Sequence, residues 1–268
     1  MFRPGLVSIT FRKLPASAIV RLAAEAKLEG IEWGGDIHVP HGQIDTARQV
    51  AGMTRDAGLE VAAYGSYYRL GEPHTDLFQS VLDTACALGA PVIRVWAGAV
   101  ASGEATQSIR DRIASDGRRI SELAQQAKIK IACEWHGHSL TDTAESAQAL
   151  FDTVGHANFL TYWQPRNPPS TDTNASVECY LTDMESALPR LAGLHVFHWD
   201  DKTGSRLPLG DGESIWKPCL RKAAAAQRGE LFALLEFVLN DDPAQMLRDA
   251  QTLHAWLHGG QEQKKISE

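Results

Sequence analysis

The sequence of 268 residues predicts one α/β domain, a (β/α)8 TIM barrel. Short apolar segments alternate with longer amphipathic segments along the chain, and this alternation gives eight strand-then-helix units. Parallel strands need helical crossovers that cover the sheet, and about 250 residues is the usual length of one such barrel. No linker divides the chain, so we expect the barrel to span 1–260 and a polar tail to occupy 261–268.

Each unit consists of a short apolar run and a segment with apolar residues at helical spacing. The predicted strands are 6–11, 30–33, 59–64, 92–96, 129–134, 159–163, 194–198 and 231–238. The predicted helices are 15–28, 46–57, 74–88, 107–128, 140–154, 176–191, 216–228 and 243–258. Gly89 directly follows the third helix, as glycine often does at a helix end, and a proline-rich loop at 164–174 precedes the sixth.

An open, doubly wound sheet is the alternative arrangement of the same units. Such a sheet usually carries a glycine-rich phosphate-binding turn after its first strand. The segment from Thr10 to Lys13 contains no glycine, which favours the barrel.

The composition is that of a soluble globular protein, with 44% hydrophobic and 22% charged residues. A formal net charge of −7 argues against a nucleic acid or a membrane as partner, because both are bound through clustered Lys and Arg. The four cysteines are far apart and lack zinc-site spacing, which indicates reduced core residues. Since neither a signal-peptide pattern nor a long apolar run is present, we expect a cytoplasmic protein that acts on small molecules.

Several predicted strands end in polar residues, and in a barrel these ends carry the catalytic groups. Glu134 ends the fifth strand, His198 ends the seventh, and Glu236 lies in the eighth. An ionised carboxylate inside a buried strand is costly unless it meets a cation or a donor. A divalent metal ion is the economical partner, and a structural histidine or a salt bridge is the alternative for each residue taken alone.

Tryptophans gather at the same strand ends. Trp33, Trp96, Trp163 and Trp199 end four strands, and Trp135 follows Glu134. Flat rings beside carboxylates and histidines suit a sugar or a polyol, whose C–H faces pack on the rings. Packing in the barrel core is the alternative for each ring.

We assign substrate contacts to five side chains at these ends and in the following loops: Trp33, His38, Trp96, His136 and Arg206. His136 lies two residues after Glu134 and so projects to the same side of an extended chain. Arg206 lies in a Gly/Pro-rich loop, where it can clamp a substrate oxygen. An orienting role for His136 and an exposed salt bridge for Arg206 are the alternatives.

The chain resembles the xylose-isomerase-like TIM barrel superfamily, which includes the sugar phosphate isomerases and epimerases. The resemblance runs from Gly30-Ile31-Glu32-Trp33 through Leu88-Gly89-Ala90 to Glu236. Its most specific part is a His-x-Lys-Asp run followed by Pro-Leu-Gly-x-Gly. These positions read His198-Trp199-Asp200-Asp201 and Pro208-Leu209-Gly210-Asp211-Gly212 here, so an aspartate stands where lysine is usual.

The resemblance implies one divalent ion held by Glu, Asp, His and Glu from the fifth to the eighth strand. Glu134, His198 and Glu236 match three of these ligands, whereas Gln164 stands at the end of the sixth strand, where Asp is usual. An amide in place of a carboxylate leaves the ion more weakly bound and a stronger Lewis acid. Mn²⁺ is the expected ion, with Mg²⁺, Co²⁺ and Zn²⁺ as alternatives.

The chemistry that the resemblance implies is proton removal beside a carbonyl or hydroxyl of a metal-bound sugar or polyol, through an enediolate. Glu134 and Glu236 are the expected catalytic acid and base. We therefore expect an isomerase or epimerase of carbohydrate metabolism, as a homodimer or homotetramer.

Three alternatives stay open. A lyase, either a dehydratase of the inosose type or a deglycosylating enzyme, can use the same enediolate to expel a β-substituent. A nuclease similar to endonuclease IV is the second alternative, and the acidic chain disfavours it because DNA is bound through clustered basic residues. The third is a non-catalytic subunit that binds a sugar.

Overall fold

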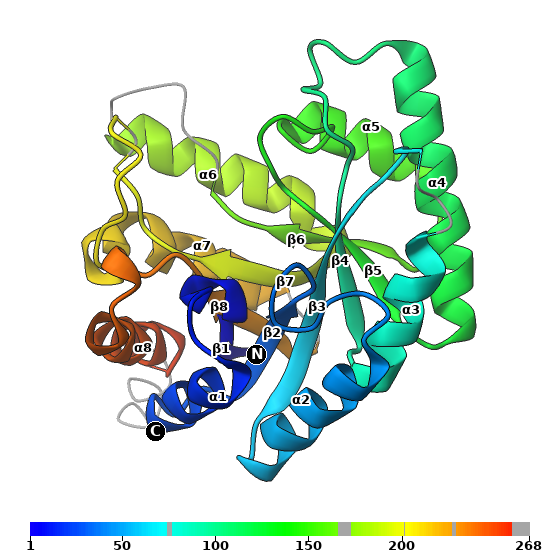
Figure 1. Ribbon diagram of the computed structural model, residues 1–268. Helices are drawn as coiled ribbons and strands as arrows, with labels where there is room; N and C mark the ends of the chain where they lie inside the picture. The colour runs from blue at the N-terminus through cyan, green and yellow to red at the C-terminus, as the bar shows by residue number, and fades with distance from the viewer. Residues whose placement is uncertain (74–76, 166–172, 201, 227–228, 259–268) are drawn as a thin grey trace.

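The computed structural model describes residues 1–73, 77–165, 173–200, 202–226 and 229–258. Eight parallel strands form a closed barrel in the order β1 to β8, and β8 pairs with β1 (Figure 1). The helices lie around the outside of this barrel (Figure 1). The prediction of a (β/α)8 barrel is confirmed, and the doubly wound alternative is wrong because the sheet has no open edge.

The strands and the α-helices alternate along the chain. The strands are β1 Phe2–Val7, β2 Gly30–Gly34, β3 Glu60–Arg69, β4 Val92–Trp96, β5 Lys130–Glu134, β6 Phe159–Trp163, β7 Leu191–Val196 and β8 Leu231–Leu235. The α-helices are α1 Ala16–Glu25, α2 Ile44–Asp56, α3 Leu77–Leu88, α4 Gln107–Gln126, α5 Ala144–Val154, α6 Thr173–Ala187, α7 Glu213–Ala226 and α8 Pro243–His258. Short 3₁₀ turns lie at Ser8–Phe11, Leu188–Arg190, Leu209–Gly212 and Leu239–Asp241.

Alternation of side chains along each strand separates two hydrophobic layers. On β4, Ile93 and Val95 belong to the large core that also includes the buried faces of the helices. Val92 belongs instead to a smaller core with Ala132, Tyr162 and Leu234, which fills the barrel interior. Because side chains on a strand alternate between its two faces, Arg94 is expected to share the inner side with Val92. The barrel interior is therefore apolar in the layer that contains Val92 and polar near the carboxyl ends of the strands.

Two strand boundaries differ from the prediction in ways that affect the site. At the first strand, the predicted segment 6–11 lies partly in the 3₁₀ turn Ser8–Phe11, and β1 begins at Phe2. At the seventh, α6 ends at Ala187 and a 3₁₀ turn containing Pro189 follows, so β7 begins at Leu191 and ends at Val196. His198 consequently lies beyond the strand.

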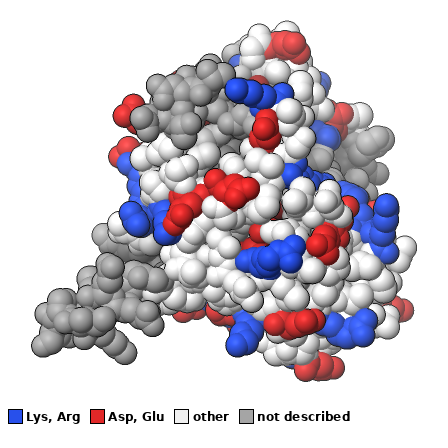
Figure 2. Space-filling view, turned by 90° about the vertical axis from the view of Figure 1, so that its left-hand side faces the viewer, with Lys and Arg blue, Asp and Glu red and all other residues white. Residues whose placement is uncertain are grey.

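The surface carries charges of both signs. On the face shown in Figure 2, Lys and Arg side chains are interspersed with Asp and Glu among the described residues. Within the described part of the chain, no helix is long and apolar enough to cross a membrane. The predicted tail at 261–268 and most of the proline-rich loop, 166–172, lie outside the described residues.

Candidate active site

A cavity of about 660 Å³ opens at the carboxyl ends of the strands. Arg94 and Trp96 of β4, Glu134 of β5, and Gln164 and Glu236 just after β6 and β8 line it. In a barrel of parallel strands this end is where catalytic groups collect.

Four charged or polar side chains form a closed ring inside the barrel, which we call the buried ring: Glu32, Arg94, Glu134 and His195. Arg94 Nε donates to Glu32 Oε1 at 2.7 Å, and Arg94 Nη1 donates to Glu134 Oε2. His195 closes the ring, with Nδ1 3.0 Å from Glu134 Oε1 and Nε2 3.2 Å from Glu32 Oε2. All four side chains are at most 4% exposed, so water screens these charges little.

Two further polar groups line the cavity with an unused oxygen. Glu236 Oε2 lies 3.6 Å from His195 Nδ1 and has no hydrogen-bond partner among the described residues. Gln164 Nε2 donates to the Trp135 carbonyl at 2.7 Å, while its Oε1 has no described partner. Buried oxygens without partners are rare in folded proteins, and they indicate that a cation or a donor belongs here.

The two cavity glutamates are in different electrostatic surroundings. Burial alone would raise the pKa of Glu134, but the charges of Arg94 and His195 outweigh it and hold the pKa well below its usual range. Burial raises the pKa of Glu236 to about 7, with the charge of His195 opposing it. Burial alone would lower the pKa of His195, but Glu236, Glu32 and Glu134 raise it to about 10.

The residues present fit a divalent metal ion. One ligand atom each from Glu134, His195 and Glu236 lies within 4.8 Å of the other two. Metal–ligand bonds of about 2.0–2.2 Å place neighbouring ligand atoms about 3–4 Å apart, as these distances allow. With a neutral His195, the three buried glutamates and Arg94 carry a formal charge of −2, which one dication balances.

Aromatic rings form much of the cavity wall. Trp96 donates its Nε1 hydrogen to Glu134 Oε2. Its ring contacts the Arg69 guanidinium, 4.0 Å away, and the His136 ring, 4.9 Å away. Trp199 and Phe237 contact each other on the opposite wall, with ring centroids 5.0 Å apart. A flat, partly apolar compound fits between such faces.

Two aromatic residues that line the cavity, Tyr67 and Phe237, have an unusual backbone. Tyr67 and Phe237 have φ angles of 58° and 53°, in the left-handed region that large side chains rarely adopt. Tyr67 lies where the pairing of β3 with β4 shifts register, and Phe237 directly follows Glu236. Such strain tends to persist at functional sites, where it directs a side chain into a cavity.

A family model described as "Xylose isomerase-like TIM barrel" matches residues 20–254. The chain belongs to the xylose isomerase-like TIM barrel family. A 3-dehydroshikimate dehydratase of Bacillus anthracis is 25% identical over 261 residues, which is 91% of this chain and 86% of the relative.

Solved structures of this family share the fold with low sequence identity. A probable 3-DHS dehydratase of Bacillus anthracis is 20% identical with a TM-score of 0.77, covering 95% of this chain and 99% of that one. A D-allulose 3-epimerase of Methylomonas sp. is 16% identical with a TM-score of 0.70, covering 94% of this chain and 96% of that one. A Mycobacterium smegmatis protein in complex with magnesium is 16% identical with a TM-score of 0.68, covering 97% of each chain. The fold of the xylose isomerase-like family is thus common to dehydratases and epimerases.

The structure brings together most of the predicted metal ligands. Glu134, Gln164 and Glu236 line one cavity, as expected. The described group of ligand atoms that lie within 4.8 Å of one another comes from Glu134, His195 and Glu236 and does not include the predicted His198. His198 follows β7 and lines the cavity, with its ring against Gly212.

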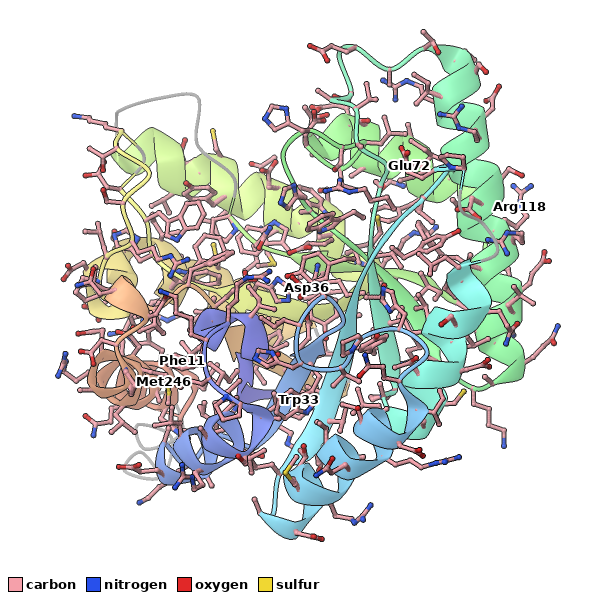
Figure 3. The ribbon with its side chains drawn as sticks, viewed as in Figure 1. Phe11, Trp33, Asp36, Glu72, Arg118 and Met246 are labelled. Atoms are coloured by element: carbon pink, nitrogen blue, oxygen red, sulfur yellow. The ribbon has the colours of Figure 1, made fainter. Side chains whose placement is uncertain are left out.

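The predicted substrate contacts divide into two groups. Trp96 and His136 line the cavity. Trp33 does not: its side chain is fully buried on the α2 side of the barrel wall, where Nε1 donates to Thr54 Oγ1 at 3.2 Å (Figure 3). His38 binds Ser8 Oγ and the Leu14 carbonyl within the loops, and Arg206 pairs with Asp241, the salt bridge that was its alternative.

The sequence prediction did not assign roles to Glu32, Arg94 and His195. A signal was nevertheless present, because side chains on a strand alternate between its faces. Leu194 and Val196 are the apolar residues that pack toward the helices, so His195 between them faces the interior. The same reasoning applies to Glu32 between Ile31 and Trp33.

Proposed function

We propose that this protein is a divalent-metal-dependent lyase that removes water from a small polyhydroxylated carbonyl compound. The difference between the two cavity glutamates carries the proposal. Both oxygens of Glu134 are engaged, Oε2 by Arg94 and Trp96 and Oε1 by His195. Glu236 keeps Oε2 without a partner among the described residues. The cavity therefore offers one available carboxylate base.

One available base suits elimination better than epimerisation. Epimerisation by two bases needs one group to take a proton from a carbon and a second to return a proton to its opposite face. In the elimination, Glu236 takes the proton beside the carbonyl, the C–H electron pair forms a C=C bond, and the bond to the β-hydroxyl breaks. Glu236 then returns the proton to the departing hydroxide, which leaves as water.

The surrounding residues supply charge and orientation. A divalent ion bound by Glu134, His195 and Glu236 supplies positive charge that stabilises the negative charge developing on a substrate oxygen. Gln164 Oε1 can accept from a substrate hydroxyl or ligate the ion. Trp96 and Phe237 give flat faces between which a ring-shaped compound packs.

The relatives support the same class of reaction. The dehydratase of Bacillus anthracis matches almost the whole chain, and 3-dehydroshikimate is therefore the first compound to test. A sugar epimerase is the second candidate, since two glutamates do line the cavity and an epimerase shares the fold.

The experiment distinguishes these two reactions. Protein loaded with Mn²⁺ is incubated in D₂O with 3-dehydroshikimate and, separately, with D-allulose, and products are analysed by mass spectrometry. We expect metal-dependent loss of one water from the first compound, abolished by EDTA. Deuterium uptake into an isomerised sugar, with no loss of water from 3-dehydroshikimate, would contradict the lyase and favour the epimerase.

A further inference from the structure

Glu32 belongs to the buried ring but does not line the cavity, so the proposed reaction does not explain why a carboxylate is buried at this position. Its side chain is fully buried, and each of its oxygens has a partner: Oε1 accepts from Arg94 at 2.7 Å and Oε2 faces His195 Nε2 at 3.2 Å. Because Glu32 does not line the cavity, it is not placed to contact a substrate there, and Arg94 and His195 occupy its two oxygens. Glu32 can act only through its two neighbours.

The two ring nitrogens of His195 face different surroundings. Nδ1 faces two cavity glutamates, Glu134 at 3.0 Å and Glu236 at 3.6 Å. Nε2 faces Glu32. An ionised carboxylate can only accept a hydrogen bond, so Nε2 must carry a hydrogen. In neutral histidine one nitrogen carries the hydrogen and the other has the free lone pair. Nδ1 also faces carboxylates and carries a hydrogen while His195 is charged. An ion between Glu134 and Glu236 can displace that hydrogen and take the Nδ1 lone pair, whereas Glu32 keeps the hydrogen on Nε2.

We propose that Glu32 is a positioning residue that fixes the tautomer of His195, so that Nδ1 binds the divalent ion and Nε2 keeps its proton. The inference rests on the proposed function, because it takes the ion to lie between Glu134, His195 and Glu236. Histidine ligands commonly donate their other ring hydrogen to a carboxylate, and removal of such a partner typically weakens metal binding about 10–100-fold.

The barrel is built around this arrangement. A Cβ atom at Gly65 on β3 would lie 2.7 Å from both Glu32 Oε1 and Arg94 Nη2, so glycine leaves the space that the pair occupies. Arg94 in turn holds Glu32 Oε1, which leaves Oε2 for His195. Tyr162 lies against the His195 ring, with centroids 5.1 Å apart, and limits rotation of the imidazole.

The first test compares Glu32→Gln with Glu60→Gln as a matched control. In Glu32→Gln the amide oxygen stays with Arg94, so the amide NH₂ faces His195 Nε2 and favours the tautomer that blocks Nδ1. We expect the Kd for Mn²⁺, measured by calorimetry, to rise about 10–100-fold. Glu60 begins β3 and pairs with Arg3 of β1, away from the strand ends that form the cavity, and its side chain is 60% exposed, so its variant should bind as the parent does.

The second test reads the tautomer in the parent protein and does not depend on whether a variant folds. Long-range ¹H–¹⁵N spectra of the Zn²⁺-loaded protein are recorded, with His195 assigned by its loss in His195→Asn. We expect a protonated Nε2 and a metal-shifted Nδ1. A protonated Nδ1, a His195 signal unchanged by the ion, or a folded Glu32→Gln with parental affinity would overturn the inference.

The two proposals fail in different ways. Metal binding with the wrong tautomer removes the role of Glu32 and leaves the lyase intact. The expected tautomer without elimination removes the lyase and leaves the role of Glu32. A parent protein that binds neither Mn²⁺ nor Zn²⁺ removes both.

Discussion

At the scale of single residues, the environment of Glu236 gives this carboxylate its chemistry. It is 4% exposed, and burial raises its pKa to about 7. In the metal-free protein this pKa balances basicity against ionisation near neutral pH, as a proton acceptor requires. Glu134, with its charge stabilised by Arg94, lacks this balance.

Glu236→Gln should therefore abolish most of the activity while the barrel stays folded. The amide keeps the shape of the side chain but cannot accept a proton, and we expect kcat to fall about 10²–10⁴-fold. Turnover of the proposed substrate is measured at saturating Mn²⁺ so that weaker metal binding does not limit it, with circular dichroism as the check on folding. Activity within about tenfold of the parent would exclude Glu236 as the base.

Gln164 is the residue at which the chain departs from its family's expected ligand set. Its Nε2 is held by the Trp135 carbonyl, which directs Oε1 away from that carbonyl. If Oε1 is a ligand, Gln164→Glu should bind Mn²⁺ more tightly because a charge is added, and Gln164→Ala should bind it more weakly. Gln164→Asp tests the shorter carboxylate. Equal affinities in all three variants, measured by calorimetry, would show that Gln164 is no ligand.

At the scale of elements, β7 illustrates what a sequence can and cannot predict. The apolar pattern identifies the strand, but its bounds depend on where α6 stops, and Pro189 in the 3₁₀ turn shifts them. A shift of about two or three residues in a strand end is enough to change which histidine faces the interior, because neighbouring residues face opposite sides. The bounds of β2 agree with the prediction, but the gathering of tryptophans at strand ends does not show which face each ring takes, and Trp33 lies on the outer face of β2.

The bounds of β7 predict different effects for His195, which lies within the strand, and His198, which lies beyond it. His195→Asn should weaken Mn²⁺ binding by at least about tenfold, because it removes a ligand that faces two glutamates. His198→Asn should leave the affinity within a few-fold of the parent and affect the Michaelis constant instead, since His198 lines the cavity but is outside the group of three ligand atoms. Calorimetric titration of both variants measures this, and loss of binding in His198→Asn alone would restore our original assignment.

At the scale of the whole molecule, closure of the barrel creates the site. Glu32, Arg94, Glu134 and His195 come from four strands, up to 163 positions apart in sequence, and each alone is compatible with an ordinary ion pair. The composition and strand pattern predict the barrel and the end at which polar groups gather. They do not predict that Arg94 holds two glutamates at once, because that contact depends on side-chain geometry across the interior.

Protons compete with the metal ion for this buried cluster, so metal binding should depend on pH. Because a bound ion stabilises the folded protein, the pH dependence should appear in the melting temperature. An ion must displace the proton that His195 holds up to a pH of about 10, and below about pH 7 also the proton on Glu236. Because both pKa values are raised in the folded protein, protons compete more strongly as the pH falls. Mn²⁺ at about 100 times its Kd contributes about 2.7 kcal/mol, which raises Tm by about 5–10 °C.

We therefore expect the Mn²⁺-induced rise in Tm, at one fixed metal concentration, to be larger at pH 8 than at pH 6. The measurement is thermal unfolding with Mn²⁺ and with EDTA at each pH, which removes the pH dependence of the metal-free protein. Glu60→Gln serves as a control that should follow the parent, since Glu60 pairs with Arg3 far from the cavity. An equal rise in Tm at both pH values would contradict the competition between the ion and the protons on His195 and Glu236.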